Sequence, residues 1–304
     1  MIKCDSNLVV ILMSFVLLLI AGARQEGFPV TAGSYPEQEP AGSSLPVKQP
    51  EGGDSLTLTY IANMGVLVNS ADSKVMIDCL FGELNRSRYP APETLDSMVK
   101  GIPPFDNIDL VLVTHKDPDH FNSAIVSRYM ETRPEPILIA PTDAVKEMRK
   151  VANDWSRIES RIISIDLEVG EEVKKEVAGI PLTIVPTLHL DDKTPMNLMY
   201  LIGINDWRIF HQGDLGKPDD FLKFGLEAAP VDLAVVGYAW PLSPNPVYPR
   251  FLQVLKPRHI ALGHVSTVIE SVAEERINQV RKYYDDIFVL LPGMPTKVFR
   301  RYND

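Results

Sequence analysis

The stretch VTHKDPDHFN (residues 113–122) continues directly from the apolar run 110–113. An apolar run of this kind predicts a buried strand. The strand would end in two histidines and two aspartates that lie within six positions: His115, Asp117, Asp119 and His120. Imidazole and carboxylate groups are ligands of divalent zinc, manganese and iron. The stretch therefore predicts a strand end that presents metal ligands.

Three later apolar runs also end in ionisable residues. His189 follows LTIVPTL, Asp214 follows IFHQG and His264 follows IALG. A single histidine at a strand end is more often a structural residue than a ligand. Strand ends at one edge of a sheet converge in space, however, so several such ends together favour a site. We interpret these residues, with those of the first stretch, as a candidate metal centre.

Strand-like and helix-like runs alternate from residue 55 onwards. The runs 56–69 and 74–82 predict two strands joined around residues 70–73, and IFVLLP (287–292) predicts a last strand after a helix at about 268–284. Asn122 and Thr142 are predicted to cap two helices. The strands outnumber those of a strict βαβ alternation, so the pattern predicts a layered α/β fold with two central sheets flanked by helices.

The first 54 residues differ in composition from the rest. Lys3 precedes the 13-residue apolar stretch 8–20, which the small residues 21–23 follow. This arrangement predicts a signal peptide at residues 1–23, and so a periplasmic or secreted protein; the alternative is a membrane tether formed by residues 8–20. Residues 24–54 are rich in Pro, Gly, Ser, Glu and Gln, which predicts a disordered linker. The folded domain is expected at residues 55–304.

The charge and the cysteine content limit which binding partners and which disulfides are expected. The 304 residues include 30 basic and 40 acidic side chains, a formal net charge of −10, with no cluster of Lys and Arg. Such a chain is a poor candidate for nucleic-acid binding, so nucleic acid is not the expected partner. Cys4 and Cys79 are the only cysteines. Cys4 lies in the predicted signal, so no disulfide is expected and Cys79 is predicted to be a small buried hydrophobe. The sequence carries no signal for an oligomeric state.

At these residues the chain resembles the metallo-β-lactamase fold superfamily. The signature of that family is His-x-His-x-Asp-His after a strand, followed by a His, an Asp and a His at later strand ends. The resemblance covers most of residues 55–300, and it includes YIANMGVLV followed by VMIDCLFG. FHQGDLG and KPRHIALGH resemble the bacterial branch related to L-ascorbate-6-phosphate lactonase. The resemblance implies an αββα sandwich of two mixed sheets with two divalent metal ions at one edge.

The same resemblance implies a division of the ligands. A first metal would be held by His115, Asp117 and His189, and a second by Asp119, His120 and His264, with Asp214 bridging the two. A metal-bridging hydroxide would be the nucleophile, and Asp119 would orient it and accept its proton. The implied activity is hydrolysis of a small ester, lactone or phosphoester.

One position departs from the family pattern. Asp117 stands where the signature has its second histidine. A set of two histidines and one carboxylate binds zinc in some hydrolases and suits manganese or iron as well. The alternatives to a hydrolase of a small ester, lactone or phosphoester are a catalytically weakened metal-binding protein of the same fold or, less favoured, a nuclease or phosphodiesterase.

Four further residues are weaker candidates. Asp78 is expected to orient a metal-ligating histidine. His211 is predicted either to face substrate or to pack as a strand histidine. Tyr238 and Trp240 form a pocket wall or simply pack within a loop.

Overall fold

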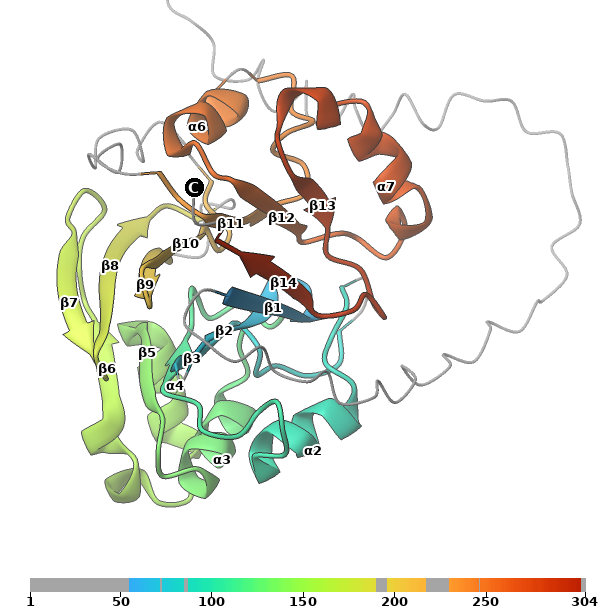
Figure 1. The fold of residues 1–304 in the computed structure, drawn as a ribbon. Helices are drawn as coiled ribbons and strands as arrows, with labels where there is room; N and C mark the ends of the chain where they lie inside the picture. The colour runs from blue at the N-terminus through green and yellow to red at the C-terminus, as the bar shows by residue number, and fades with distance from the viewer. Residues whose placement is uncertain are drawn as a thin grey trace, which may run out of the picture. The chain divides into compact units, whose positions relative to one another are not determined.

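Two seven-stranded sheets face each other in the computed structural model, which describes residues 55–71, 73–84, 87–189, 196–216, 230–245 and 247–301 (Figure 1). All of these residues belong to one compact unit, Pro40–Asp304. The predicted signal peptide at residues 1–23 and the predicted linker at residues 24–54 lie outside the described residues, so both stay predictions.

The first sheet has the strand order β14-β1-β2-β3-β4-β5-β6. Its strands are β1 (Ser55–Ala62), β2 (Gly65–Ser70), β3 (Ser73–Ile77), β4 (Leu110–Leu112), β5 (Ile137–Pro141), β6 (Ile162–Ile165) and β14 (Lys297–Arg300). Strands β3 to β6 run parallel, whereas β14, β1, β2 and β3 pair antiparallel. The sheet is therefore mixed.

The second sheet repeats this plan in the order β13-β12-β11-β10-β9-β8-β7. Its strands are β7 (Val173–Val177), β8 (Ile180–Thr187), β9 (Asn197–Ile204), β10 (Trp207–His211), β11 (Leu233–Gly237), β12 (His259–Gly263) and β13 (Ile287–Val289). Strands β10 to β13 are parallel, and β7 to β10 are antiparallel. Because parallel strands point the same way, their carboxyl ends lie at one edge of the sheet.

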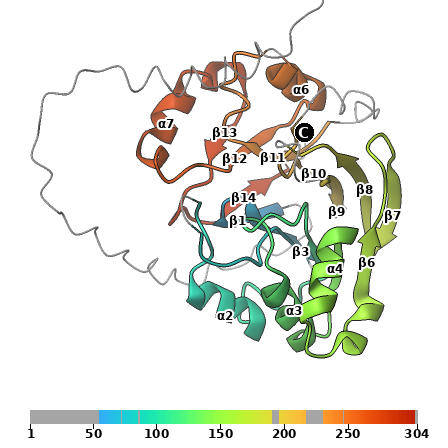
Figure 2. The ribbon, with the colours of Figure 1, turned by 180° about the vertical axis from the view of Figure 1, so that it is seen from behind.

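Helices cover the outer face of each sheet (Figures 1 and 2). The first sheet carries α2 (Pro92–Lys100), α3 (Ser123–Thr132) and α4 (Thr142–Val151), and the second carries α6 (Val247–Leu255) and α7 (Glu270–Asn278). Three short 3-10 segments also occur among the described residues: η1 (Trp155–Arg157), η2 (Glu159–Arg161) and η4 (Arg281–Tyr283). The αββα sandwich of two mixed sheets is confirmed.

Side-chain alternation along the strands builds three apolar layers. In β3, Ile77 points into the layer between the sheets while Met76 packs beneath the helices. The central layer includes Leu112 of the first sheet and Tyr200 of the second, all fully buried. Burial of each large apolar side chain contributes about 1.5–3 kcal/mol, so this layer fixes how the sheets face each other.

The first strand-like run is a hairpin and not a single strand. The prediction of one strand over 56–69 is wrong, because the chain turns at Asn63 and Met64 between β1 and β2. Asn63 adopts a left-handed conformation (φ 49°), which asparagine tolerates better than most residues. A Cβ on Gly65 would lie 2.5 Å from the carbonyl oxygen of Asp78, so only glycine fits after the turn.

Of the two predicted helix caps, one is confirmed and the other is wrong. The Asn122 side chain accepts hydrogen bonds from the N–H groups of Ala124 and Ile125, which confirms it as the cap of α3. Thr142 does not cap α4. Its hydroxyl donates instead to the carbonyl oxygen of Ile165, which ties the start of the helix to β6.

The prediction that Cys79 is a small buried residue is confirmed. Cys79 is buried, and its thiol lies within hydrogen-bonding distance of the carbonyl oxygens of Val66 and Ile77. Burial raises the pKa of this thiol, which keeps it protonated and unreactive.

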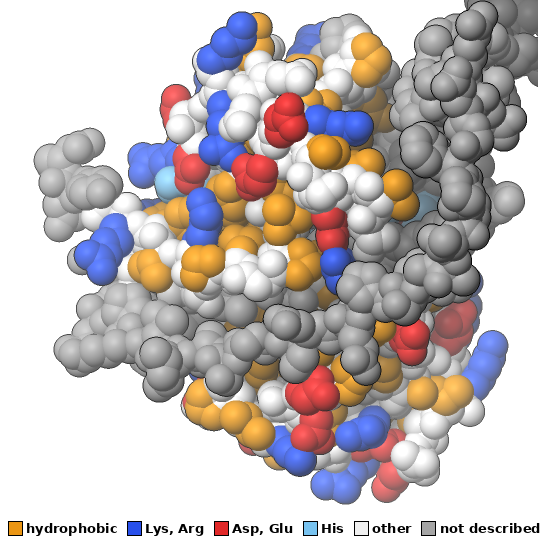
Figure 3. Space-filling view, turned by 90° about the vertical axis from the view of Figure 1, so that its right-hand side faces the viewer, with side chains coloured by type: hydrophobic (Ala, Val, Ile, Leu, Met, Phe, Trp, Pro, Cys, Tyr) orange, Lys and Arg blue, Asp and Glu red, His pale blue; other side chains and the backbone are white. Residues whose placement is uncertain are grey.

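The described surface is mixed in character. On the face shown in Figure 3, basic and acidic side chains are interspersed around an apolar area. Among the helices of the described residues, none combines the length and the apolar character needed to cross a membrane.

Candidate metal centre

Four strand ends bring the candidate residues together. His115 follows β4 of the first sheet, while His189, Asp214 and His264 follow β8, β10 and β12 of the second. The sheets are joined at this edge by the hydrogen bond from the Leu198 N–H to the Thr114 carbonyl oxygen, 2.8 Å. The predicted convergence of strand ends is therefore present in the structure.

The ligand atoms form two groups. The first group is His115, His189 and Asp214, and the second group is Asp119, His120 and His264. Within each group the ligand atoms lie within 4.8 Å of one another. Each group takes residues from both sheets, so the centre lies at the junction between the sheets.

Asp214 lies between the two groups. Its Oδ2 is 3.6 Å from Nε2 of His189 in the first group and 3.1 Å from Nε2 of His264 in the second. Its Oδ1 is 3.4 Å from Nε2 of His120. The Asn197 carboxamide oxygen accepts the Asp214 N–H at 2.8 Å, which fixes the loop that carries this carboxylate. One carboxylate thus reaches both groups, as a bridging ligand must.

Asp117 lies beside the first group. Its Oδ2 is 3.5 Å from Nε2 of His189 and 4.0 Å from Nε2 of His115. The carboxylate therefore faces the same point as these two imidazoles. This position matches the one that the resemblance gives to the second histidine of the signature.

Asp78 sets the orientation of two histidines. Its carboxylate accepts hydrogen bonds from the Thr114 N–H (2.8 Å) and hydroxyl (2.6 Å), and from Nδ1 of His120 (2.8 Å). The single hydroxyl proton of Thr114 is thereby used, so its oxygen accepts from Nδ1 of His115 at 2.9 Å. Both imidazoles carry their proton on Nδ1 and turn Nε2 towards the centre.

The buried Nε2 of His115 is an acceptor without a hydrogen-bond partner among the described residues. Burial and the nearby His120 lower the pKa of His115 to about 3, so the ring is neutral at ordinary pH. Burying an acceptor without a partner costs free energy. A cation at this point would bind the free lone pair, and the residues present fit a divalent metal ion.

The second group is held together by charge in the metal-free chain. Although burial lowers the pKa of His264, Asp214 and Asp119 raise it well above 6.5. Burial raises the pKa of Asp119, but the hydrogen bond to His264 and the charge of His120 bring it to about 2. Nε2 of His264 and Oδ2 of Asp119 are 3.3 Å apart. A cation at this group would replace protons that now neutralise the carboxylates.

The opposite pKa shifts of His264 and His115 predict that these two histidines titrate at different pH values. In metal-free protein, His264 should stay protonated well above pH 6.5, whereas His115 should stay neutral down to about pH 3. The raised pKa of His264 stabilises the fold below its unfolded pKa, and that contribution is lost as the pH rises through the folded pKa. Histidine ring proton shifts in an NMR pH titration measure both values. Asp214→Asn should lower the pKa of His264, and titration of both rings near pH 6.5 would contradict the prediction.

Two further predicted residues, His211 and Tyr238, make hydrogen bonds to the backbone. His211 donates from Nε2 to the Met64 carbonyl oxygen (3.0 Å), and its Nδ1 accepts the Gly213 N–H (3.2 Å). The ring therefore packs as a strand histidine and holds the loop before Asp214. The hydroxyl of Tyr238 donates to the carbonyl oxygen of Ala273 in α7, 3.2 Å away.

Trp240 packs against helix α6. Its ring meets those of Tyr248 and Phe251 edge-on, with centroids 4.9 Å and 4.8 Å away. The side chain is buried by these contacts. Of the two interpretations of Tyr238 and Trp240, the contacts favour packing.

Asn63 is a site residue that is not among those predicted from the sequence. Its carboxamide nitrogen lies 3.1 Å from Oδ2 of Asp119 and 3.2 Å from Nε2 of His120. The signal in the sequence is Asn-Met-Gly inside an apolar stretch, since Asn and Gly favour turns. That signal places a turn between β1 and β2, but it does not show which ligands the turn meets.

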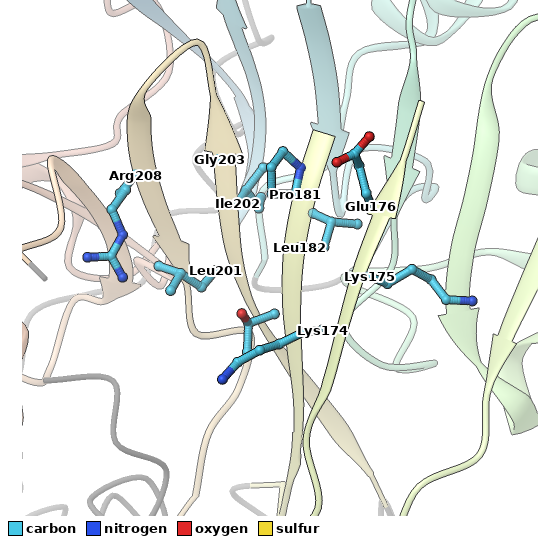
Figure 4. Close-up of a pocket in the computed structure, with 10 residues that line it drawn as sticks. Lys174, Lys175, Glu176, Pro181, Leu182, Leu201, Ile202, Gly203 and Arg208 are labelled. Carbon is cyan, nitrogen blue, oxygen red and sulfur yellow. The ribbon is translucent and has the colours of Figure 1, made fainter. Parts of the chain in front are cut away.

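A cavity of about 530 Å³ lies elsewhere, on the outer side of β7 to β10 (Figure 4). Its lining includes Lys174, Leu201 and Arg208. None of the residues that line it belongs to the two groups. Among the described residues, metal-ligating side chains converge at the two groups and not at this cavity, so the groups are the candidate site.

Comparison with known proteins defines the class. The family model described as a beta-lactamase superfamily domain matches residues 73–277, which include every member of both groups. The chain belongs to this superfamily of metallo-hydrolases. Among curated proteins, none matches the sequence significantly.

Solved structures show the same fold. Igni18, a metallo hydrolase from Ignicoccus hospitalis, is 16% identical with a TM-score of 0.55 over 82% of this chain and 100% of its own. The metallo-beta-lactamase fold protein YhfI from Bacillus subtilis is 13% identical, with a TM-score of 0.54 over 82% of this chain and 100% of its own. CmlA, a diiron beta-hydroxylase from Streptomyces venezuelae, is 12% identical, with a TM-score of 0.50 over 83% of this chain and 55% of its own. At such identities these likenesses show the fold alone.

Proposed function

We propose that the protein is a two-metal hydrolase of small esters, lactones or phosphoesters. The observation that carries the proposal is the carboxylate of Asp214, which reaches His189 in the first group and His120 and His264 in the second. When bound, divalent ions lower the pKa of a water molecule towards ~7 and polarise a carbonyl or phosphoryl oxygen. The proposed ligands are His115, Asp117, Asp119, His120, His189, Asp214 and His264.

The chain's own residues prepare this chemistry. Asp78 and Thr114 hold the imidazoles of His115 and His120 with Nε2 facing inwards, so little reorganisation is needed when ions bind. Burial of both rings excludes solvent from that side of the centre. Lower exposure to water strengthens every charge interaction there.

Asp119 is assigned the proton-accepting role. It is ionised at neutral pH, because His264 and His120 offset the effect of burial and bring its pKa to about 2. Its side chain is 21% exposed, so a water molecule can reach it. The role assigned to Asp119 is to orient the attacking water and take up its proton.

Metal content and a substrate panel test the proposal. Elemental analysis should find two ions per chain after reconstitution with zinc, manganese or ferrous iron, and the loaded protein should hydrolyse lactones or phosphodiesters in a panel that also includes β-lactams. Lactones come first, because FHQGDLG and KPRHIALGH resemble the L-ascorbate-6-phosphate lactonase branch. Protein that folds normally but binds no ion would contradict the proposal and favour a weakened member of the same fold.

Asp117 is expected to set the metal preference. A carboxylate favours harder ions such as manganese or ferrous iron, and imidazole favours zinc. Asp117→His should therefore raise the affinity for zinc over manganese by about tenfold. Competition between the two ions, followed by elemental analysis, measures the ratio.

The matched control for this substitution is Asp96→His. Asp96 lies on the exposed side of α2 in an ion pair with Lys100, so the substitution adds a histidine away from the centre. The control should leave the ratio unchanged. An unchanged ratio in Asp117→His as well would show that Asp117 is not a metal ligand.

Export and the small-molecule partner are further parts of the proposal. A basic start, an apolar stretch at residues 8–20 and a small-residue exit support a cleaved signal or an anchor. The net charge of −10 supports a small-molecule substrate over nucleic acid.

A further inference from the structure

Asn63 contacts every member of the second group. Its carboxamide nitrogen lies 3.1 Å from both Oδ2 and the carbonyl oxygen of Asp119, and 3.2 Å from Nε2 of His120. Its carbonyl oxygen accepts the His264 N–H at 3.1 Å. One residue of the β1–β2 turn thus holds the loop of Asp119 through its side chain and the strand end of His264 through its backbone.

The amide protons of Asn63 suit the metal-loaded state of the group. A carboxamide nitrogen has two protons, and Asp119 offers two oxygens at 3.1 Å. Both protons can therefore be used on Asp119 alone, which leaves the lone pair on Nε2 of His120 for a cation. The bond to Oδ2 orients the Asp119 carboxylate, and the bond to the carbonyl oxygen holds the backbone that carries it, before an ion arrives.

The backbone around Asn63 is shaped for this contact. Asn63 (φ 49°) and His264 (φ 58°) are both in the left-handed region, where few residues other than glycine are found. A Cβ on Gly263 would lie 3.0 Å from the Asn63 carbonyl oxygen and 2.6 Å from Sδ of Met64. Glycine at this position lets the turn approach the end of β12 closely.

We propose that Asn63 is a positioning residue that sets the affinity of the second group for its ion. This inference rests on the proposed metal-binding function and adds a dependence of one metal on the β1–β2 turn. Loss of a hydrogen bond that orients a ligand lowers metal affinity by about 10–100-fold. The first group has no contact with the Asn63 side chain among the hydrogen bonds of the described residues, so its affinity stays the same.

Asn63→Gly is the variant that isolates the amide. Glycine adopts the left-handed conformation without strain, so the turn and the bond from the His264 N–H are kept while the carboxamide is lost. Asn63→Ala is the second variant, with the same loss of the amide and some backbone strain. Calorimetric titration of the full chain with Zn²⁺ measures both affinities, and elemental analysis after dialysis counts the ions that remain.

Asn205→Gly is a matched control. Asn205 is also a left-handed asparagine (φ 45°) in a hairpin turn, between β9 and β10, and its carboxamide donates to the Ser70 carbonyl oxygen at 2.7 Å. Its substitution removes the same side chain from the same kind of turn, in contact with a residue outside both groups. Both metal affinities of this variant should equal those of the unsubstituted protein.

The outcomes separate this inference from the function on which it rests. We expect the unsubstituted chain to bind two ions, and both Asn63 variants to keep one affinity and lose 10–100-fold in the other. Two unchanged affinities in Asn63→Gly would overturn the role of Asn63 and leave the hydrolase proposal standing. A tighter second ion would also overturn it, because the amide would then compete for His120. An unsubstituted chain that binds no ion would overturn both.

Discussion

Asp214→Ala should remove metal from both groups at once, and hydrolytic activity with it. The Asp214 carboxylate lies 3.6 Å from Nε2 of His189 and 3.1 Å from Nε2 of His264, so this one substitution removes a carboxylate that contacts both groups. The expected loss of metal affinity exceeds the ~100-fold that marks the loss of an orienting hydrogen bond, because a charged ligand is lost outright. Elemental analysis and turnover of the metal-loaded protein measure the two effects.

A comparison with single-group variants sharpens this prediction. His189→Ala should weaken mainly the first group and His264→Ala mainly the second, while each leaves the fold largely intact. Asp286→Ala removes a carboxylate that pairs with His259 at the opposite end of β12 and should change neither affinity. If Asp214→Ala keeps two tightly bound ions, the bridging assignment is wrong.

Of the substitutions proposed for this protein, Asp78→Ala should cause the largest decrease in the free energy of unfolding. The Asp78 carboxylate is buried and accepts from the Thr114 N–H, the Thr114 hydroxyl and Nδ1 of His120. Removing one member of a buried charged pair costs about 3–5 kcal/mol, since its partner is left without compensation. Asp78 is also left-handed (φ 50°), a conformation that alanine adopts less readily than aspartate.

Urea unfolding of metal-free protein measures the stability without a contribution from bound ions. Asp78→Asn is the informative partner variant, because it keeps the shape and the tolerance of a left-handed backbone but loses the charge opposite His120. It should fall between the parent and Asp78→Ala in free energy of unfolding. A change of less than ~1 kcal/mol in Asp78→Ala would show that water replaces the lost bonds and that Asp78 does not organise the centre.

The candidate metal centre could be predicted from the sequence because its residues stand at the ends of apolar runs. His115, His189 and His264 each follow such a run, and the two-sheet architecture brings these ends together. The placement of Asp214 between the groups depends on the Asn197 contact, which joins residues from different strands. No local pattern in the sequence shows a contact of that kind.

Asn63 illustrates the limit of periodicity. The run 56–69 is rich in strand-forming residues on both sides of the turn, and β2 is buried along most of its length, so the pattern does not reveal the reversal. The strands β7 and β14 are not predicted for a different reason. Both lie at sheet edges and expose charged side chains such as Lys174 and Arg300, which weakens the apolar signal.

Each group takes its residues from both sheets, and this arrangement has a consequence for stability. An ion in either group would act as a cross-link between the two halves of the chain, with His115 or His120 on one side and His189 or His264 on the other. A ligand present at 100 times its dissociation constant stabilises the native state by about 2.7 kcal/mol. Depletion of metal would then loosen the junction between the sheets first and expose the chain there to proteolysis. The lifetime of the protein would follow the local supply of metal.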